Sequence, residues 1–105
     1  MSRKKNIKFD NLKIGPFTWT YEETKEKSSK SLGECSFENL LITVQSDLKK
    51  DIKISTIFHE LVHSFFASTG YIPKNEEAIT DILACQLLFF LRNNPEFLDY
   101  LKKLL

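Results

Sequence analysis

The chain has 105 residues, of which 15 are basic and 14 are acidic, and its formal charge is +1. Hydrophobic residues make up 42% of the sequence, with only three glycines and three prolines, so a collagen-like or wholly disordered chain is excluded. The near-zero charge predicts no direct contact with nucleic acid and no attraction to an anionic membrane. The apolar runs fall far short of the roughly 20 residues that a membrane-spanning helix needs.

The first half of the chain, residues 6–45, has the composition of β structure. Apolar and β-branched residues recur on either side of a Gly-Pro turn at residues 15–16, which predicts two strands joined by that turn. A charged, serine-rich stretch then separates them from a second apolar region. The expected elements are strands over residues 7–14 and 17–21, an exposed loop or hairpin tip over 22–31, a short strand over 34–37 and a clear strand over 40–44.

The second half, residues 46–105, has helical periodicity. Apolar side chains recur every three or four positions over residues 51–69, and a glycine and a proline soon afterwards mark the end of that helix. A second helix is expected over residues 75–93, with acidic residues in its first turn. A third, short helix opens at Asn94 and Pro95.

Together these elements predict a single domain over residues 1–105 with an α+β fold. We expect a small antiparallel sheet of three to four strands packed on two to three helices, with the helix over residues 51–69 at the centre. The stretches at residues 65–66 and 87–90 are more apolar than one helix face needs, which favours a dense core between two helices. The alternative is an exposed surface for a protein partner or a homodimer.

The N-terminus and the two cysteines indicate the compartment. No apolar stretch follows the basic residues at the start of the chain, so we expect no secretory signal. Cys35 and Cys85 are too few for a small disulfide-stabilised secreted domain, and they predict free thiols and a cytoplasmic location. Cys85, in an apolar helical context, is expected to contribute to packing.

The helix over residues 51–69 carries the pattern HExxH, formed by His59, Glu60 and His63. Histidines four residues apart lie on one helix face, so their imidazoles can hold one metal ion. Glu60 is rotated by about 100° from His59 and is placed to act on a water molecule rather than to bind the ion. The chain has only two histidines, and both belong to this motif. Burying these polar groups without a purpose would be costly, so a metal site is favoured over a plain core helix.

A catalytic zinc ion takes three protein ligands and keeps a fourth position for water, so a third ligand is needed. With no other histidine available, it must be a carboxylate or a thiolate. Glu77, in the first turn of the next helix, is the preferred candidate, and Glu76 is the alternative metal ligand. Asp81, one turn after Glu77, could accept the outer N–H of either histidine and fix its tautomer. Acids at a helix start also stabilise the helix without any metal.

This arrangement resembles the gluzincins, in which HExxH on one helix is completed by a glutamate on the next. It is most similar to compact ImmA/IrrE-type and phage-encoded zincin-like metallopeptidases, which share a small β-rich N-terminal part and a Glu-Ala segment that opens the second helix. The likeness covers roughly residues 35–100. It implies that His59, His63 and Glu77 bind one Zn²⁺ ion and that Glu60 is the general base.

The resemblance implies a zinc-dependent endopeptidase, encoded by a phage or mobile element, that cleaves a protein substrate. Larger gluzincins use an extra His or Tyr to stabilise the oxyanion, and Tyr71 is the candidate here, with Tyr21 and Tyr100 as rivals. The strand over residues 40–44 is expected to form the sheet edge beside the cleft, where an extended substrate would add by main-chain hydrogen bonds. The alternative is a zinc-stabilised interaction or regulatory domain whose peptidase site is inert or latent.

Overall fold

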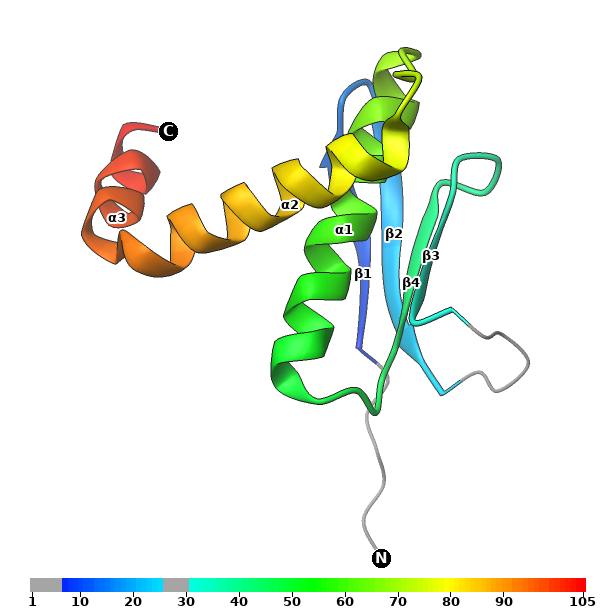
Figure 1. Ribbon diagram of the computed structural model, residues 1–105, viewed down its shortest axis with the longest axis horizontal. Helices are drawn as coiled ribbons and strands as arrows, with labels where there is room; N and C mark the ends of the chain where they lie inside the picture. The colour runs from blue at the N-terminus through cyan, green and yellow to red at the C-terminus, as the bar shows by residue number, and fades with distance from the viewer. Residues whose placement is uncertain (1–6, 26–30) are drawn as a thin grey trace, which may run out of the picture.

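The computed structural model describes residues 7–25 and 31–105 of the chain. The elements run in the order β1 (Lys8–Ile14), β2 (Phe17–Thr24), β3 (Gly33–Ser36), β4 (Leu41–Gln45), α1 (Lys50–Thr69), α2 (Glu76–Asn93) and α3 (Pro95–Leu104). The four strands form one sheet, α1 lies along one face of it, and α2 crosses α1 and leads to α3 (Figure 1). The α+β class is confirmed, with four strands and three helices in these described ranges.

The sheet is mixed rather than antiparallel. Its strand order is β1-β2-β4-β3. β1 pairs antiparallel with β2 and β3 with β4, but β2 and β4 run parallel, from Thr20 beside Leu41 to Thr24 beside Gln45. The expectation of an antiparallel sheet is therefore wrong for the central pair. Turns between consecutive strands have a local sequence signal, whereas the pairing between the two hairpins is set by which strands bury their apolar faces under α1.

β2 continues past the start of the loop predicted over residues 22–31, of which residues 26–30 lie outside the described part of the chain. Glu23 explains this difference, because its carboxylate is buried with two partners. It accepts hydrogen bonds from the hydroxyl of Tyr21 at 2.7 Å and from the ammonium of Lys53 at 2.8 Å. These bonds replace the water that the carboxylate loses, so a charged residue can continue the strand.

The core lies between the sheet and α1. It is made by Ile14 at the end of β1 and by side chains of the two central strands that are at most 7% exposed: Trp19, Tyr21, Ile42 and Val44. Ile57 and Leu61 of α1 pack against this cluster. The indole N–H of Trp19 also donates a hydrogen bond of 3.0 Å to the hydroxyl of Ser68 near the end of α1. Packing and this bond together fix α1 across the sheet.

Gly70 ends α1 and turns the chain back toward the same helix. Its φ of 78° lies in the left-handed region, and its backbone N–H reaches the carbonyls of Phe66 and Ala67, which is the usual glycine cap of a helix C-terminus. The first turns of α2 then pack on α1, where Thr80 and Ala84 are buried. The helices predicted over residues 51–69 and 75–93 are thus confirmed. None of the three described helices has the length and apolarity to cross a membrane.

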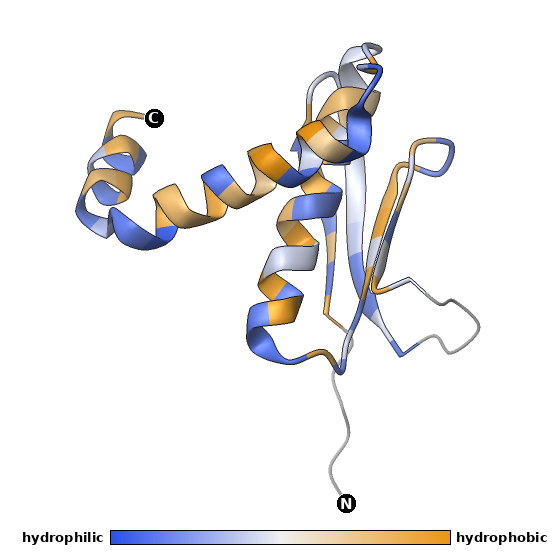
Figure 2. Cartoon of the chain, viewed as in Figure 1, coloured by the Kyte–Doolittle hydropathy of each residue, from blue (hydrophilic) through white to orange (hydrophobic). Residues whose placement is uncertain are grey.

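The apolar stretches of the helices do not form the dense core that we expected. Phe65 is 42% exposed, Phe89 is 52% exposed and Phe90 is 48% exposed. The reason is that α2 diverges from α1 after its first turns and places α3 away from the sheet (Figures 1 and 2). Many apolar side chains of α2 and α3 are therefore exposed to solvent. Cys85 is also exposed rather than packed, although it and Cys35 are free thiols, as expected.

Candidate metal centre

The two histidines of the HExxH motif lie on one face of α1. Their rings are nearly perpendicular, with centroids 4.8 Å apart and an interplanar angle of 72°. The Nε2 atoms of His59 and His63 face each other at 3.2 Å. Two imidazole nitrogens therefore point into the same small space, as the spacing of the motif predicted.

Glu77 brings a carboxylate to this space from the first turn of α2. One carboxylate oxygen lies 3.3 Å from Nε2 of His59, and the other lies 3.1 Å from Nε2 of His63. The turn at Gly70 makes this approach possible, because it returns the chain to the motif within a few residues. His59, His63 and Glu77 form a group of metal-ligating side chains whose ligand atoms all lie within 4.8 Å of one another.

The outer nitrogens of both rings also have carboxylate partners. Oδ1 of Asp81 lies 3.0 Å from Nδ1 of His59, and Oε2 of Glu76 lies 2.6 Å from Nδ1 of His63. A carboxylate at Nδ1 favours the tautomer that carries its proton there and leaves a lone pair on Nε2. Glu76, the alternative ligand of the sequence analysis, thus lies on the side of the ring away from Glu77, where it can orient His63.

A zinc ion fits this set of side chains. Nitrogen and oxygen ligands held tetrahedrally at about 2.0–2.1 Å from zinc are about 3.3 Å apart. The two Nε2 atoms are 3.2 Å apart, and each lies 3.1–3.3 Å from a different oxygen of Glu77. With both outer nitrogens protonated, two lone pairs and an anionic carboxylate converge on one point. Three acceptors at these distances repel one another unless a cation lies between them.

Glu60 lies next to the histidines but is buried, with only 8% of its surface exposed. Burial raises the pKa of its carboxyl, the neighbouring His59 and His63 oppose that rise, and the negative charges of Glu77 and Glu34 add to it. A carboxylate whose pKa is raised by burial accepts a proton more readily than one in water. This is the property that a general base beside a metal site requires.

Gly33, at the start of β3, lets the sheet approach α1 beside Glu60. A Cβ atom at this position would lie 2.8 Å from Cγ2 of Thr56 and 3.2 Å from Cγ of Glu60, and the first distance is a steric clash. Glycine therefore sets the spacing between β3 and the motif helix. This role was not predicted from the sequence, although a glycine in a strand is a signal of close approach.

A cavity of about 600 Å³ lies between β3, α1 and the first turn of α2. The metal-binding set and Glu60 line it on the helix side, and residues 33–37 line it on the sheet side. β3 is an edge strand of the sheet, and its residues line the cavity. The edge of the sheet beside the cavity is therefore β3. The expectation that the strand over residues 40–44 forms this edge is wrong, because β4 is paired on both sides, with β2 and with β3.

Cys35 of β3 also lines this cavity. Burial, followed by the charges of Glu60 and Glu76, raises the pKa of its thiol to about 12. The thiol therefore stays protonated in the metal-free chain at neutral pH. Its sulfur does not belong to the group of metal-ligating atoms that His59, His63 and Glu77 form.

The tyrosines considered as oxyanion stabilisers are not among the described residues that line the cavity. Tyr71 follows α1 and is 66% exposed, Tyr21 donates to Glu23 in the core, and Tyr100 lies on α3. The described lining includes no lysine or arginine either. Among the lining residues that the structure describes, hydrogen-bond donors to a substrate are the backbone, the histidines and the hydroxyl and thiol groups of the wall.

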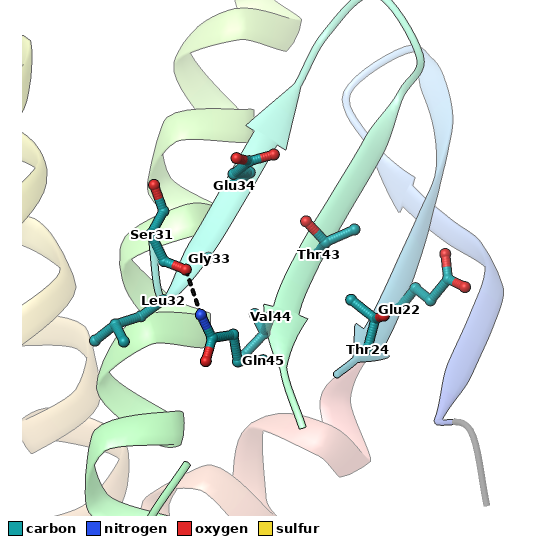
Figure 3. Close-up of a pocket in the computed structure, with 9 residues that line it drawn as sticks. All are labelled: Glu22, Thr24, Ser31, Leu32, Gly33, Glu34, Thr43, Val44 and Gln45. Atoms are coloured by element: carbon teal, nitrogen blue, oxygen red, sulfur yellow. Dashed lines mark hydrogen bonds between the residues drawn. The ribbon is translucent and has the colours of Figure 1, made fainter. Parts of the chain in front are cut away.

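A second hollow, of about 270 Å³, lies on the face of the sheet that α1 does not cover (Figure 3). Glu22, Glu34 and Thr43 extend from three neighbouring strands over it, and the amide of Gln45 donates a hydrogen bond of 2.7 Å to the carbonyl of Ser31. No histidine lines this hollow in the described chain. Its polar side chains are those expected on the solvated face of a sheet.

Comparisons with known proteins identified no relative of this chain. A scan against protein-family models, a search of curated proteins and a search of solved structures each gave no significant match. The resemblance to the gluzincins therefore stays an expectation that depends on the HExxH motif and Glu77.

Proposed function

We propose that this chain is a zinc-dependent metallopeptidase that hydrolyses peptide bonds of a protein substrate. One observation carries the proposal: the side chains of His59, His63 and Glu77 converge with separations of 3.1–3.3 Å, and the buried carboxylate of Glu60 lies beside them in the same cavity. Neither helix packing nor capping requires two imidazoles and a carboxylate to meet at one point. The resemblance of the motif to the gluzincins supports the same assignment.

The proposed binding site divides the work between inner and outer side chains. His59, His63 and Glu77 would hold the ion, while Asp81 and Glu76 would keep the two rings in the tautomer and orientation that binding needs. When bound, zinc supplies Lewis-acid chemistry, in that it polarises a carbonyl group and makes a water molecule more acidic.

Glu60 is proposed as the general base. It would accept a proton from the water that attacks the substrate carbonyl, and would then return that proton to the leaving amine. The burial that raises its pKa would favour its holding the proton between the two events. Because Glu60 is part of α1 and packs closely against Gly33, the movement of its side chain would be limited.

We propose that an extended substrate binds along β3. This strand is last in the sheet order and borders the cavity, so a peptide could continue the sheet there through main-chain hydrogen bonds. Its scissile bond would then cross the cavity in front of the histidines. Two described side chains of the wall, Cys35 and Phe37, would contact its side chains.

The test combines zinc analysis with a cleavage screen. Purified, reconstituted protein should hold one zinc ion per chain and should cleave members of an unbiased peptide library, as read by mass spectrometry. Glu60→Gln should keep the zinc and lose cleavage, whereas Glu38→Gln, at an exposed acid outside the cavity, should change neither. Cleavage that survives in Glu60→Gln removes the general-base assignment, and failure to bind zinc removes the metal site.

A second candidate is a zinc-stabilised interaction or regulatory domain with an inert or latent peptidase site. It is favoured by the described lining of the cavity, which contains no tyrosine, lysine or arginine to stabilise an oxyanion. On this alternative, zinc would raise the unfolding temperature by binding only the folded chain, and neither wild type nor Glu60→Gln would cleave the library. Zinc binding without any turnover would therefore favour the second candidate over the first.

We place either function in the cytoplasm. The support is that Cys35 and Cys85 are both free thiols, which is the usual state of cysteine in a reducing compartment. An origin in a phage or mobile element is proposed on the resemblance alone.

A further inference from the structure

The second half of α2 and all of α3 stand apart from the rest of the domain. α1 packs on the sheet and on α2, whereas α3 packs on α2 and lies away from the sheet (Figure 1). The rings of Phe90 on α2 and Phe97 on α3 meet edge to face, with centroids 5.9 Å apart. The two helices therefore present one joined surface, which is separate from the proposed zinc site.

This surface is more apolar than an exposed helix pair should be. Residues 82–91 of α2 contain no charged side chain, and a helix that is apolar on all sides is normally buried. Here most of its large side chains are exposed, and Figure 2 shows the apolar character of this stretch in orange. We define the α2–α3 surface by the exposed residues Leu83, Leu87, Phe90, Phe97, Tyr100 and Leu104.

The charges on α3 identify an occupant for this surface. Glu96 and Asp99 lie in the first half of the helix, and Lys102 and Lys103 lie in its last turn. At about 100° per residue, Glu96 and Lys103 lie about 20° apart, on one flank of the apolar stripe. Asp99 and Lys102 point away from the stripe, toward solvent. Two such helices packed antiparallel would bring Glu96 of each copy opposite Lys103 of the other.

We propose that the α2–α3 surface binds a second copy of this chain, with the two α3 helices antiparallel about a two-fold axis near Tyr100. Glu96 and Lys103 set this centre, because the midpoint between them lies between residues 99 and 100. An interface of this kind is isologous, which means that every contact occurs twice. Parallel packing would instead align equal positions, which keeps Glu96 away from Lys103 of the other copy.

The size of the surface suits a dimer. The six side chains that define it are 39% to 64% exposed. If each offers about 100 Å², roughly half of what a large aromatic side chain can bury, they offer roughly 600 Å² per chain, which is at the lower limit of a standard interface. A lipid surface is a poorer match, because amphipathic helices that bind membranes carry mainly lysine and arginine on the polar face.

The first test measures the mass of the full chain in solution. Light scattering and sedimentation at about 100 µM should find a dimer of the 12.3 kDa chain, since interfaces of this area have dissociation constants of micromolar or below. Leu87→Glu with Phe90→Glu should give a monomer with the same circular dichroism spectrum. Ile52→Glu, at an exposed apolar residue on the first turn of α1, should leave the dimer intact.

The second test exchanges charges between copies. Glu96→Lys with Asp99→Lys makes α3 basic throughout, and Lys102→Glu with Lys103→Glu makes it acidic throughout. Each variant alone should dimerise at least about tenfold more weakly, because the contacts between position 96 of one copy and position 103 of the other become repulsive, and an equimolar mixture should restore the dimer. A monomeric wild type, a dimer unaffected by the Leu87 and Phe90 changes, or a mixture that does not recover would overturn the proposal, as would binding to lipid vesicles by a chain that stays monomeric.

Discussion

Glu76 and His63 form the shortest contact of the candidate metal centre, with Oε2 of Glu76 2.6 Å from Nδ1 of His63. The next residue, Glu77, presents its carboxylate to Nε2 of the same ring at 3.1 Å. Two successive acids thus contact opposite edges of one imidazole. This relationship separates a residue that orients a ligand from a residue that is a ligand, although both are glutamates in one helical turn.

The two glutamates should therefore differ in what they contribute to zinc affinity. Glu77→Gln removes an anionic ligand and should weaken zinc binding by more than about 100-fold, whereas Glu76→Gln should weaken it by about 10- to 100-fold, because it only loosens His63. Competition with a chromophoric chelator at neutral pH measures both values, and Glu38→Gln is the matched control. Equal losses, or a larger loss in Glu76→Gln, would exchange the two roles.

The two cysteines should react with iodoacetamide at very different rates in the metal-free protein. Cys85 is exposed, whereas burial raises the pKa of Cys35 from 9.0 to about 12. Because only the thiolate reacts, this rise lowers the reactive fraction of Cys35 by about a thousandfold near pH 8. Mass spectrometry should find one fast adduct on Cys85 and a second only in urea. Two equally fast adducts in the folded chain would contradict the burial of Cys35.

The same shift predicts how stability changes at alkaline pH. The folded state keeps the proton of Cys35, while the unfolded thiol loses its proton above pH 9 or so, so the unfolded state binds fewer protons there. The free energy of unfolding should therefore fall as pH rises from about 9 toward 12. Tyr21, whose pKa is also raised by burial, acts in the same direction. Urea denaturation of Cys35→Ala should give a shallower fall between pH 8 and 10 than wild type.

Much of this fold follows from local sequence signals. The periodicity of α1, the left-handed cap at Gly70 and the motif spacing all operate within a few residues, and each is found where the sequence predicted it. The parallel pairing of β2 with β4 is different, because it depends on which strands share the core under α1. A single sequence carries no period or turn signal for that choice.

The candidate site divides in the same way. The pair of histidines is fixed by one helix, so its geometry could be predicted from spacing alone. The roles of Glu76 and Gly33 depend instead on how α2 and β3 approach α1, which the sequence does not encode locally. The prediction that Phe89 and Phe90 are buried was wrong because an apolar pattern indicates that a helix face is suited to burial. It does not indicate whether the residues that bury it belong to the same chain.

Lys53, in the first turn of α1, should stabilise the end of the domain opposite the Gly70 cap. Its ammonium lies 2.8 Å from the buried carboxylate of Glu23, so Lys53→Met leaves that charge without its cation. We expect a loss of about 2 kcal/mol in the free energy of unfolding, or a fall of roughly 10 °C in melting temperature for a domain of this size. Lys8→Met is the control, because Lys8 and Asp10 form an exposed pair at 3.8 Å; an equal fall in both variants would contradict the role of Glu23.

Gly33 should matter to activity as well as to stability. Gly33→Ala would place a Cβ 2.8 Å from Thr56 and 3.2 Å from Glu60, so β3 or α1 must shift at the general base. Gly70→Ala is the matched control, because nothing lies within 4 Å of its Cβ and only its φ of 78° is strained, at a cost of about 1 kcal/mol. In assays well below both melting temperatures, Gly33→Ala should lose cleavage while still binding zinc, and Gly70→Ala should retain both. Full cleavage by Gly33→Ala would show that the position of Glu60 tolerates the shift.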